Sequence, residues 1–334
     1  MSALRAVRDA ALFCGSCALV CAAIYHALPF PRPPGISQKY LHFAQHRDAY
    51  DTIFVGSSRF YHHIIPRQFD AAVAAATGQQ LRSFNFGYDA MWPPESYYML
   101  RQILALRPTR LRWVFIDLMD IDPKLNEQYT GTMRMAYWHD WRHTRLAVEE
   151  ILRSTGPTLG QSRLLADHAA LFAKQLLNFG RGAEWFEDRL AWKKKDWAPP
   201  KDWRETEGYK AGPADPLPAD ARGDFVQRVS GLKTDPPLAQ LSPVLHAAMT
   251  DLIAEVRAAG AQPIFVLSPT VLAREFFAPP PTGAQFIAFN DPQKYPQLYD
   301  PEVRYDTWHF NPRGAALFTD LLAERFALLL KGPP

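Results

Sequence analysis

Two short polar segments near opposite ends of the chain carry the residue types that cleave an ester. Gly56-Ser57-Ser58-Arg59 follows an apolar run, and Asp306-Thr307-Trp308-His309 lies close to the C-terminus. A serine hydroxyl becomes a nucleophile when an imidazole takes its proton and a carboxylate orients that imidazole. On a turn, Asp306 can reach the Nδ1–H of His309 and leave Nε2 facing a serine. The two segments together predict a nucleophile at Ser58 with His309 as its base.

The serine turn also has a purely structural interpretation. Residues 52–55 are β-branched or aromatic, which is typical of a buried strand in a parallel sheet, and Gly56 ends this strand. Ligands collect at such strand ends, because backbone N–H groups there are free to point at them. Ser57 or Ser58 could instead be only the N-cap of the next helix. The downstream Asp and His favour Ser58 as the nucleophile and leave Ser57 as its neighbour.

Strands that alternate with helices predict the α/β class. Short apolar runs at 81–86, 113–118 and 262–267 join the run at 52–55 as strands, and 286–289 can add a further short one. Because each strand is short and continuously apolar, with helices between, we expect a central, mostly parallel sheet. Asn311-Pro312 caps a last helix over 313–330, which places the Asp-x-x-His segment on the loop before it.

Composition limits the class of partner. The 334 residues are 48% hydrophobic and 21% charged, as in globular proteins. A balance of 37 basic against 34 acidic residues gives a net charge of +3, too weak to predict nucleic-acid binding. All three cysteines, Cys14, Cys17 and Cys21, lie in the first apolar segment, so no disulfide or cysteine nucleophile is expected beyond it.

Residues 10–28 predict a membrane anchor, so we divide the chain into an anchor at 1–30 and an α/β domain at 31–334. Arg5 and Arg8 precede the uncharged run, and prolines follow it. The run is near the lower limit of about 20 residues that span a bilayer. An uncleaved signal anchor is favoured over a cleaved signal peptide, because no small-x-small site follows, and over a buried helix, because no face is polar. The positive-inside rule then predicts a single-pass inner-membrane protein with a cytoplasmic N-terminus and the domain in the periplasm or outside.

Residues 123 to about 240 interrupt the α/β pattern. Helical patterns occur at 144–154 and 163–178, and six of the nine tryptophans fall between Trp138 and Trp203. We interpret this segment as a largely helical insertion or lid. Its aromatic side chains could stack on sugars or lie at a membrane interface, but ordinary packing is favoured.

Other polar groups invite a metal interpretation that we do not adopt. His62-His63 stand alone, and His139 and His143 have helical spacing beside Asp140 but no evident third ligand. The carboxylates between 117 and 122 follow a predicted strand, where a solvated corner is favoured over a cation site. We therefore predict no metal and no cofactor.

The ordered set Gly56-Ser57-Ser58-Arg59, Asn85-Phe86-Gly87 and Asp306-Thr307-Trp308-His309 resembles the SGNH (GDSL-like) hydrolase superfamily. It is similar in particular to the membrane-anchored bacterial branch that includes the alginate O-acetylation proteins and the D-alanyl-transfer protein of teichoic-acid modification. The resemblance covers about 51–122 and 241–330. It implies a three-layer α/β sandwich of the SGNH/flavodoxin-like type.

The resemblance also implies roles for single residues. Ser58 matches the nucleophile, with Ser57 standing where the common Gly-Asp-Ser motif has aspartate. His309 matches the base and Asp306 its orienting carboxylate. Gly87 matches the glycine whose N–H joins the Ser58 N–H in the oxyanion hole, although a turn with positive φ would also select glycine.

One block of the family pattern is missing. The third block usually supplies an asparagine after the third strand, but residues 117–122 contain none. Asn85 is a stand-in for that donor or a turn-forming residue. Arg59 binds an anionic group of the substrate or pairs with a nearby carboxylate.

The function implied by the resemblance is acyl-ester hydrolysis or O-acyl transfer outside the cytoplasm through a Ser58 acyl-enzyme. Its substrate would be an acylated cell-surface glycan or a small acyl ester, and its partner a membrane acyltransferase. The alternative is a non-catalytic SGNH-like partner of a membrane acyltransferase or polysaccharide-export complex. The missing asparagine favours this alternative, because a lost oxyanion donor costs about 3 kcal/mol of transition-state stabilisation.

Overall fold

The chain forms two compact units. The computed structural model describes residues 3–27, 30–31, 33, 35–129, 131–153, 158–178, 181, 205–232, 241–272 and 284–331. The helical unit comprises Met1–Gln38 and Pro123–Trp197, and the α/β unit comprises Lys39–Asp122 and Ala198–Pro334.

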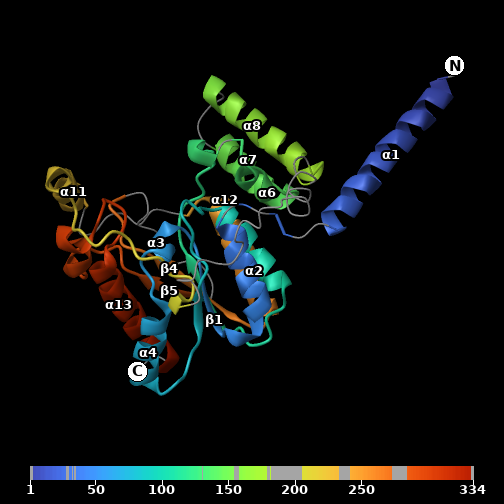
Figure 1. Cartoon of the computed structure of the whole chain (residues 1–334). Coiled ribbons are helices and arrows are strands. Elements are labelled where there is room, and N and C mark those ends of the chain that lie inside the picture. The colour runs from blue at the N-terminus through green and yellow to red at the C-terminus, as the bar shows by residue number, and fades with distance from the viewer. Residues whose placement is uncertain are drawn as a thin grey trace, which may run out of the picture. The chain divides into compact units, whose positions relative to one another are not determined.

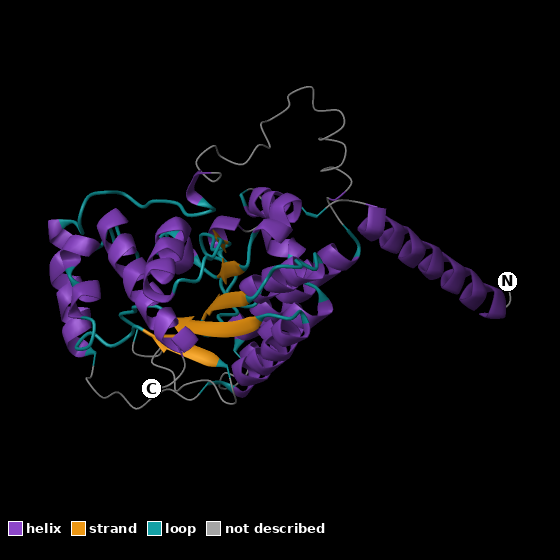
Figure 2. Ribbon diagram, turned by 90° about the horizontal axis from the view of Figure 1, so that it is seen from below, coloured by secondary structure: helices purple, strands orange, loops and turns teal. Residues whose placement is uncertain are grey.

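The α/β unit is built on a five-stranded parallel sheet. The strand order is β2-β1-β3-β4-β5, and every neighbouring pair runs parallel. This confirms the predicted sheet and the short fifth strand, and Figure 2 shows the strands with helices packed around them. Their bounds are β1 Thr52–Val55, β2 Ser83–Asn85, β3 Trp113–Asp117, β4 Gln262–Leu267 and β5 Gln285–Ala288.

Helices cover both faces of this sheet, which confirms the three-layer prediction. One face packs against α4 (Pro66–Thr77) and α13 (Pro312–Lys331), and the other against α5 (Glu95–Ala105) and α12 (Pro243–Ala258) (Figure 1). The unit also contains α2 (Ile36–His46), α3 (Ser58–Tyr61), α11 (Ala219–Gly231) and the 3₁₀ turns η1 (Arg47–Ala49), η4 (Pro296–Tyr299) and η5 (Pro301–Val303).

Aromatic side chains fill the layer under α4 and α13. The Phe115 ring lies 4.8 Å from Phe54 on β1 and 5.1 Å from Phe326 on α13, measured between centroids. Phe69 of α4 stacks on Phe326 at 5.7 Å. All four side chains are fully buried, and burying each such ring contributes about 1.5–3 kcal/mol. This packing fixes the helix that follows His309 against the strand that precedes Ser58.

The helical unit carries α1 (Ala3–Ala27), η2 (Glu127–Tyr129), α6 (Met133–Tyr137), α7 (Trp141–Arg153) and α8 (Leu159–Leu176). Leu4–Ile24 of α1 has a mean hydropathy of 1.7, and its most apolar stretch has no buried residue. Among the described residues it is the one helix long and apolar enough to cross a membrane. The segment is thus an exposed apolar helix of the kind found in signal anchors and signal sequences, and its orientation stays a prediction.

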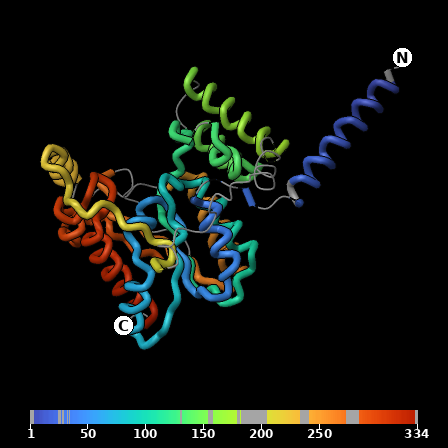
Figure 3. The backbone as a smooth tube through the Cα atoms, in the orientation of Figure 1, coloured from blue at the N-terminus to red at the C-terminus, as the bar shows by residue number. Residues whose placement is uncertain are grey.

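The segment predicted as one insertion is divided between the two units. Its first part, Pro123–Trp197, belongs to the helical unit, whereas residues 205–232 fold with the α/β unit. Phe225 of α11 is fully buried, and the Arg304 guanidinium lies 5.1 Å from its ring, so the yellow α11 runs beside the red C-terminal elements (Figure 3). Four of the six tryptophans, Trp185, Trp192, Trp197 and Trp203, lie outside the described residues.

Candidate active site

The turn after β1 presents Ser58 at the start of a short helix. Ser57 is the N-cap of α3: its Oγ accepts the Arg59 N–H at 3.2 Å, and its carbonyl accepts the Phe60 N–H at 3.0 Å. The structural interpretation of the turn is therefore confirmed for Ser57, and Ser58 stays the predicted nucleophile. Ser58 is half-buried and is the first residue of the helix. Its N–H has no acceptor in the part of the chain that the structure describes, as is usual for the first turn of a helix.

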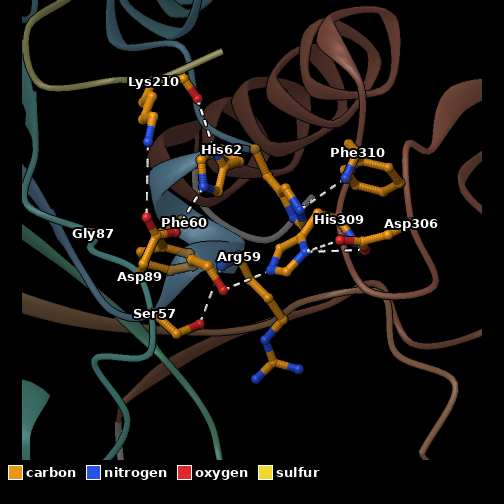
Figure 4. Close-up of polar contacts among 12 residues, drawn as sticks. Ser57, Arg59, Phe60, His62, Gly87, Asp89, Lys210, Asp306, His309 and Phe310 are labelled. Atoms are coloured by element: carbon orange, nitrogen blue, oxygen red, sulfur yellow. Dashed lines mark hydrogen bonds and ion pairs between the residues drawn. The ribbon is translucent and has the colours of Figure 1, made fainter. Parts of the chain in front are cut away.

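His309 connects this serine to a carboxylate. Its Nε2 lies 2.7 Å from Ser58 Oγ, and its Nδ1 lies 2.8 Å from Asp306 Oδ2. Figure 4 shows His309 between Asp306 and the turn that carries Ser57 and Arg59. A carboxylate on Nδ1 places a proton there and leaves Nε2 as the acceptor for the serine hydroxyl. The structure thus brings together the three residues predicted as nucleophile, base and orienting group.

Asp306 is held in its ionised form. Its Oδ1 accepts the backbone N–H groups of Trp308 and His309, each at 2.7 Å, which tightens the turn between carboxylate and imidazole. Burial alone would raise the pKa of Asp306, but the His309 hydrogen bond and charge, with these two N–H groups, lower it below its ordinary value.

Buried side chains fix the loop that carries this pair. Arg304 donates through Nη2 to Leu298 O at 3.0 Å and through Nη1 to Thr307 O at 3.3 Å. Burial lowers the pKa of Arg304 to about 10, which still leaves it charged at neutral pH. His63 accepts the Phe310 N–H on its Nε2 at 3.1 Å, next to His309. Burial lowers the pKa of His63 well below its ordinary value, so this imidazole is neutral with its proton on Nδ1.

Asp117, at the end of β3, supports the serine turn from inside. Its Oδ2 accepts the Ser57 hydroxyl at 2.6 Å, and the Arg59 guanidinium lies 3.4 Å from its Oδ1. Gly56 has to be glycine here, because a Cβ would come within 2.3 Å of Asp117 Cβ. Asp117 is buried, so the solvated corner predicted for this residue is wrong. Arg59 is also buried and pairs with Asp117, which is the carboxylate partner that one of its two predicted roles requires.

Two of the predicted oxyanion donors, Gly87 and Asn85, already have hydrogen-bond partners within the protein. The Gly87 N–H donates to Asn85 Oδ1 at 2.8 Å, so this donor is already engaged within the protein. The Asn85 amide donates to Phe60 O at 2.7 Å and Ile64 O at 2.8 Å, and its side chain is fully buried. Asn85 therefore has the turn-forming role, holding α3 against β2. Gly87 is required by close packing, since a Cβ would meet Tyr61 N at 2.5 Å, and not by positive φ.

A second imidazole lies beside His309 that sequence reasoning left unused. The His62 ring is 5.7 Å from the His309 ring, measured between centroids. Its Nδ1 contacts Lys210 O at 2.8 Å and its Nε2 contacts Asp89 Oδ1 at 2.8 Å (Figure 4). Lys210 O and Asp89 Oδ1 are both acceptors, so each suits a hydrogen bond from a ring N–H of His62. Burial alone would raise the pKa of Asp89, but the bond and charge of His62, with Lys210, hold it below its ordinary value.

Lys39 is a further residue that the sequence did not single out. Its Nζ donates to Asn85 O at 3.0 Å, Gly87 O at 2.5 Å and Gly208 O at 2.7 Å. The side chain is fully buried, and burial lowers the pKa of Lys39 well below its ordinary value. It ties α2 to the loop that contains Gly87. A single lysine on an amphipathic helix gives no sequence signal for such a role.

The histidines of the helical unit have separate partners. His139 Nε2 lies 2.9 Å from His168 Nδ1, whereas His143 Nδ1 lies 2.6 Å from Asp140 Oδ1. All three imidazoles are buried. No group of three or more His, Cys, Asp or Glu side chains that could hold a metal ion occurs within the described ranges.

No protein-family model matches the chain, and no curated protein matches it significantly. What the structure establishes at this level is an α/β fold with a five-stranded parallel sheet, an N-terminal apolar helix and a helical insertion. The roles of the site residues stay predictions that this geometry supports.

The bond between Ser57 and Asp117 can be tested by a double-mutant cycle. Ser57→Ala and Asp117→Ala each leave a buried polar group without its partner, at a cost of about 1–3 kcal/mol. Since both substitutions remove the same bond, we expect the double variant to lose less free energy of unfolding than the sum of the two single variants. The difference, a coupling energy of about 0.5–3 kcal/mol, is measured by urea unfolding of the detergent-solubilised chain. Ser57→Ala combined with Asp122→Ala is the matched control and should be additive. Additive losses in both cycles would remove Asp117 as the support of the turn.

The lowered pKa of Asp306 predicts how stability depends on pH. A carboxylate whose folded pKa is lowered contributes stability that is complete above its unfolded pKa of about 3.9 and is lost as the pH falls through the folded value. We therefore expect Asp306→Asn to be less stable than the unchanged chain near neutral pH, with the difference shrinking in acid. Thermal unfolding of both proteins across the acid range measures it. A difference that widens on acidification would contradict the ionised, hydrogen-bonded carboxylate.

Proposed function

We propose that this protein is a serine-dependent acyl-ester hydrolase or O-acyltransferase of the SGNH type, anchored in the membrane by α1. The observation that carries the proposal is the continuous hydrogen-bonded series from Ser58 Oγ through His309 to Asp306, with bonds of 2.7 and 2.8 Å. The half-buried Ser58 lies at the carboxyl end of β1, where open parallel sheets place their chemistry.

The proposed reaction has two stages. His309 Nε2 takes the proton of Ser58 as Oγ attacks the acyl carbonyl, and the imidazolium then gives this proton to the departing alcohol. Asp306 stabilises the imidazolium without taking its proton. Water or a glycan hydroxyl then attacks the acyl-serine, with His309 again as the base. Water completes hydrolysis, and a glycan hydroxyl completes transfer.

The oxyanion that forms in each stage needs donors. The Ser58 N–H has no acceptor among the described residues and supplies the first one. The Gly87 N–H supplies a second only when it exchanges Asn85 Oδ1 for the oxyanion. A donor of this kind is worth about 3 kcal/mol in the transition state. The proposed enzyme is therefore slow on simple esters and depends on its natural substrate to recruit Gly87.

The proposed substrate is an acylated glycan of the cell surface. Support comes from the exposed apolar helix α1, which suits a membrane anchor, and from the resemblance to the anchored branch that acylates extracellular polymers. In this proposal the N-terminus is cytoplasmic, the α/β unit is in the periplasm or outside, and a membrane acyltransferase supplies the acyl group.

A non-catalytic role in the same setting is the second candidate. The observation that favours it is the pairing of the Gly87 N–H with Asn85, which leaves one open donor at Ser58. In this case the unit would bind an acylated glycan or a membrane acyltransferase without turnover.

A fluorophosphonate probe tests the nucleophile directly. We expect the unchanged chain to be labelled and Ser58→Ala to lose the label, because only Ser58 has its Oγ on His309. Ser57→Ala is the matched control and should remain labelled at a lower rate, since the Ser57 hydroxyl is turned to Asp117. Loss of label in both variants with retained folding, or its persistence in Ser58→Ala, would remove Ser58 from the role.

Complementation separates the two functions. In cells that lack this protein and have altered surface-glycan acylation, a Ser58→Ala/His309→Ala variant should fail to restore the acylation if the serine reacts. Surface acyl groups released by mild alkali give the measurement. Full restoration by the double variant would leave only the non-catalytic role.

A further inference from the structure

Helix α8 exposes an uncharged face along its whole length. At 100° per residue, its exposed side chains other than Arg163, Asp167 and Gly160 lie within about 120° of the helix surface. His168 is the one buried residue of this helix. The face consists of Leu159, Ser162, Ala166, Ala169, Ala170, Ala173 and Leu176, with Leu177 directly after the helix.

Large apolar side chains lie at both ends of this face. Leu159 is 89% exposed and Leu176 is 56% exposed. The one hydroxyl of the face, on Ser162, already donates to Thr158 O at 3.2 Å, so no polar group there requires water. Trp141 of α7 is also exposed, and its ring lies 6.1 Å from Phe172 near the same end as Leu176. Tryptophan is enriched where a bilayer meets water.

The end of α8 is joined to the apolar helix α1. Asn178 Nδ2 donates to Cys21 O at 2.9 Å, and Cys21 Sγ lies 3.8 Å from Leu177 O. Cys21 is three residues before Ile24, the end of the membrane-length segment, which is about 4.5 Å along the helix axis. When α1 spans a bilayer, these contacts hold Leu177 at the level where hydrocarbon meets the headgroups.

Charged residues border the face on one side. Arg163 and Lys174 lie next to the uncharged arc on the helix surface, beside Leu159 and Ala170. A helix with an apolar face and basic residues at its edge is suited to lie in the interface plane of a membrane with anionic lipids.

We propose that α8 lies in the headgroup region of the bilayer that α1 spans, with the Leu159–Leu176 face in contact with acyl chains. The ligand of this surface is lipid. The inference rests on the membrane-anchor part of the proposed function and not on the serine chemistry. It gives the helical unit a purpose of its own, which is to fix that unit against the membrane surface.

Site-specific photo-crosslinking tests the proposal in the full chain, reconstituted in vesicles of phosphatidylethanolamine and phosphatidylglycerol. A benzophenone amino acid replaces Leu176 in one variant and Asp167 in the matched control. Both positions are exposed on α8, and they lie on opposite sides of the helix, about 180° apart. We expect several-fold more lipid adduct at position 176 than at position 167, detected by mass spectrometry of the α8 peptide.

Two results would overturn the inference. Equal lipid adducts at the two positions would show no preferred face, and protein–protein adducts in place of lipid at position 176 would assign the face to another chain. Alkaline carbonate extraction of the same vesicles distinguishes a failure of the α8 proposal from a failure of the membrane anchor. A chain that is extracted is not anchored by α1, whereas a retained chain without the position preference refutes α8 alone.

Discussion

The hydrogen bond between Ser58 and His309 is the interaction on which the α/β unit depends for any chemistry. It joins residues 251 positions apart in the chain. Helix α3 carries Ser58 and the turn before α13 carries His309, so the bond forms only when the fold brings these two elements together. The distance between Ser58 Oγ and His309 Nε2 depends on the aromatic layer in which Phe326 of α13 contacts Phe69 and Phe115. A change in that packing would move the imidazole relative to the hydroxyl, and proton transfer tolerates little displacement.

Around this bond the buried ionisable side chains have hydrogen-bond or ion-pair partners. The buried Arg304 donates to two carbonyl groups. The buried Asp117 accepts a hydrogen bond from the Ser57 hydroxyl and forms an ion pair with Arg59. A buried charge without partners would cost several kcal/mol, so each pair stabilises one loop conformation and penalises the others. Lys39 likewise contacts three carbonyl groups, although burial lowers its pKa well below the ordinary value. These groups fix the positions of the loops that carry Ser58 and His309.

Local pattern was enough to predict the sheet and the separate Gly-Ser-Ser and Asp-x-x-His segments, and the family resemblance joined Ser58 to Asp306 and His309. Each of those features is encoded within a few residues, such as the apolar run before Gly56 or the Asn311-Pro312 cap. The partners of Asp117 and Lys39 could not be predicted, because they come from segments far away in sequence. Residues 205–232 were assigned to the insertion for the same reason: their contacts to the α/β unit, such as Phe225 under Arg304, have no periodic signal.

The peptide of Gly87 decides how far the site is prepared for catalysis. Its carbonyl accepts from Lys39, its N–H donates to Asn85, and its Cα packs where Tyr61 N leaves no room for a side chain. Three constraints on one peptide make its rotation costly. In the proposed reaction the Ser58 N–H would therefore carry most of the oxyanion charge unless contacts with the substrate offset that cost. Contacts with the remote parts of a large substrate can offset the cost of rotating this peptide, whereas a small ester makes few such contacts. If the proposed function holds, this arrangement favours transfer on an extended glycan over hydrolysis of simple esters.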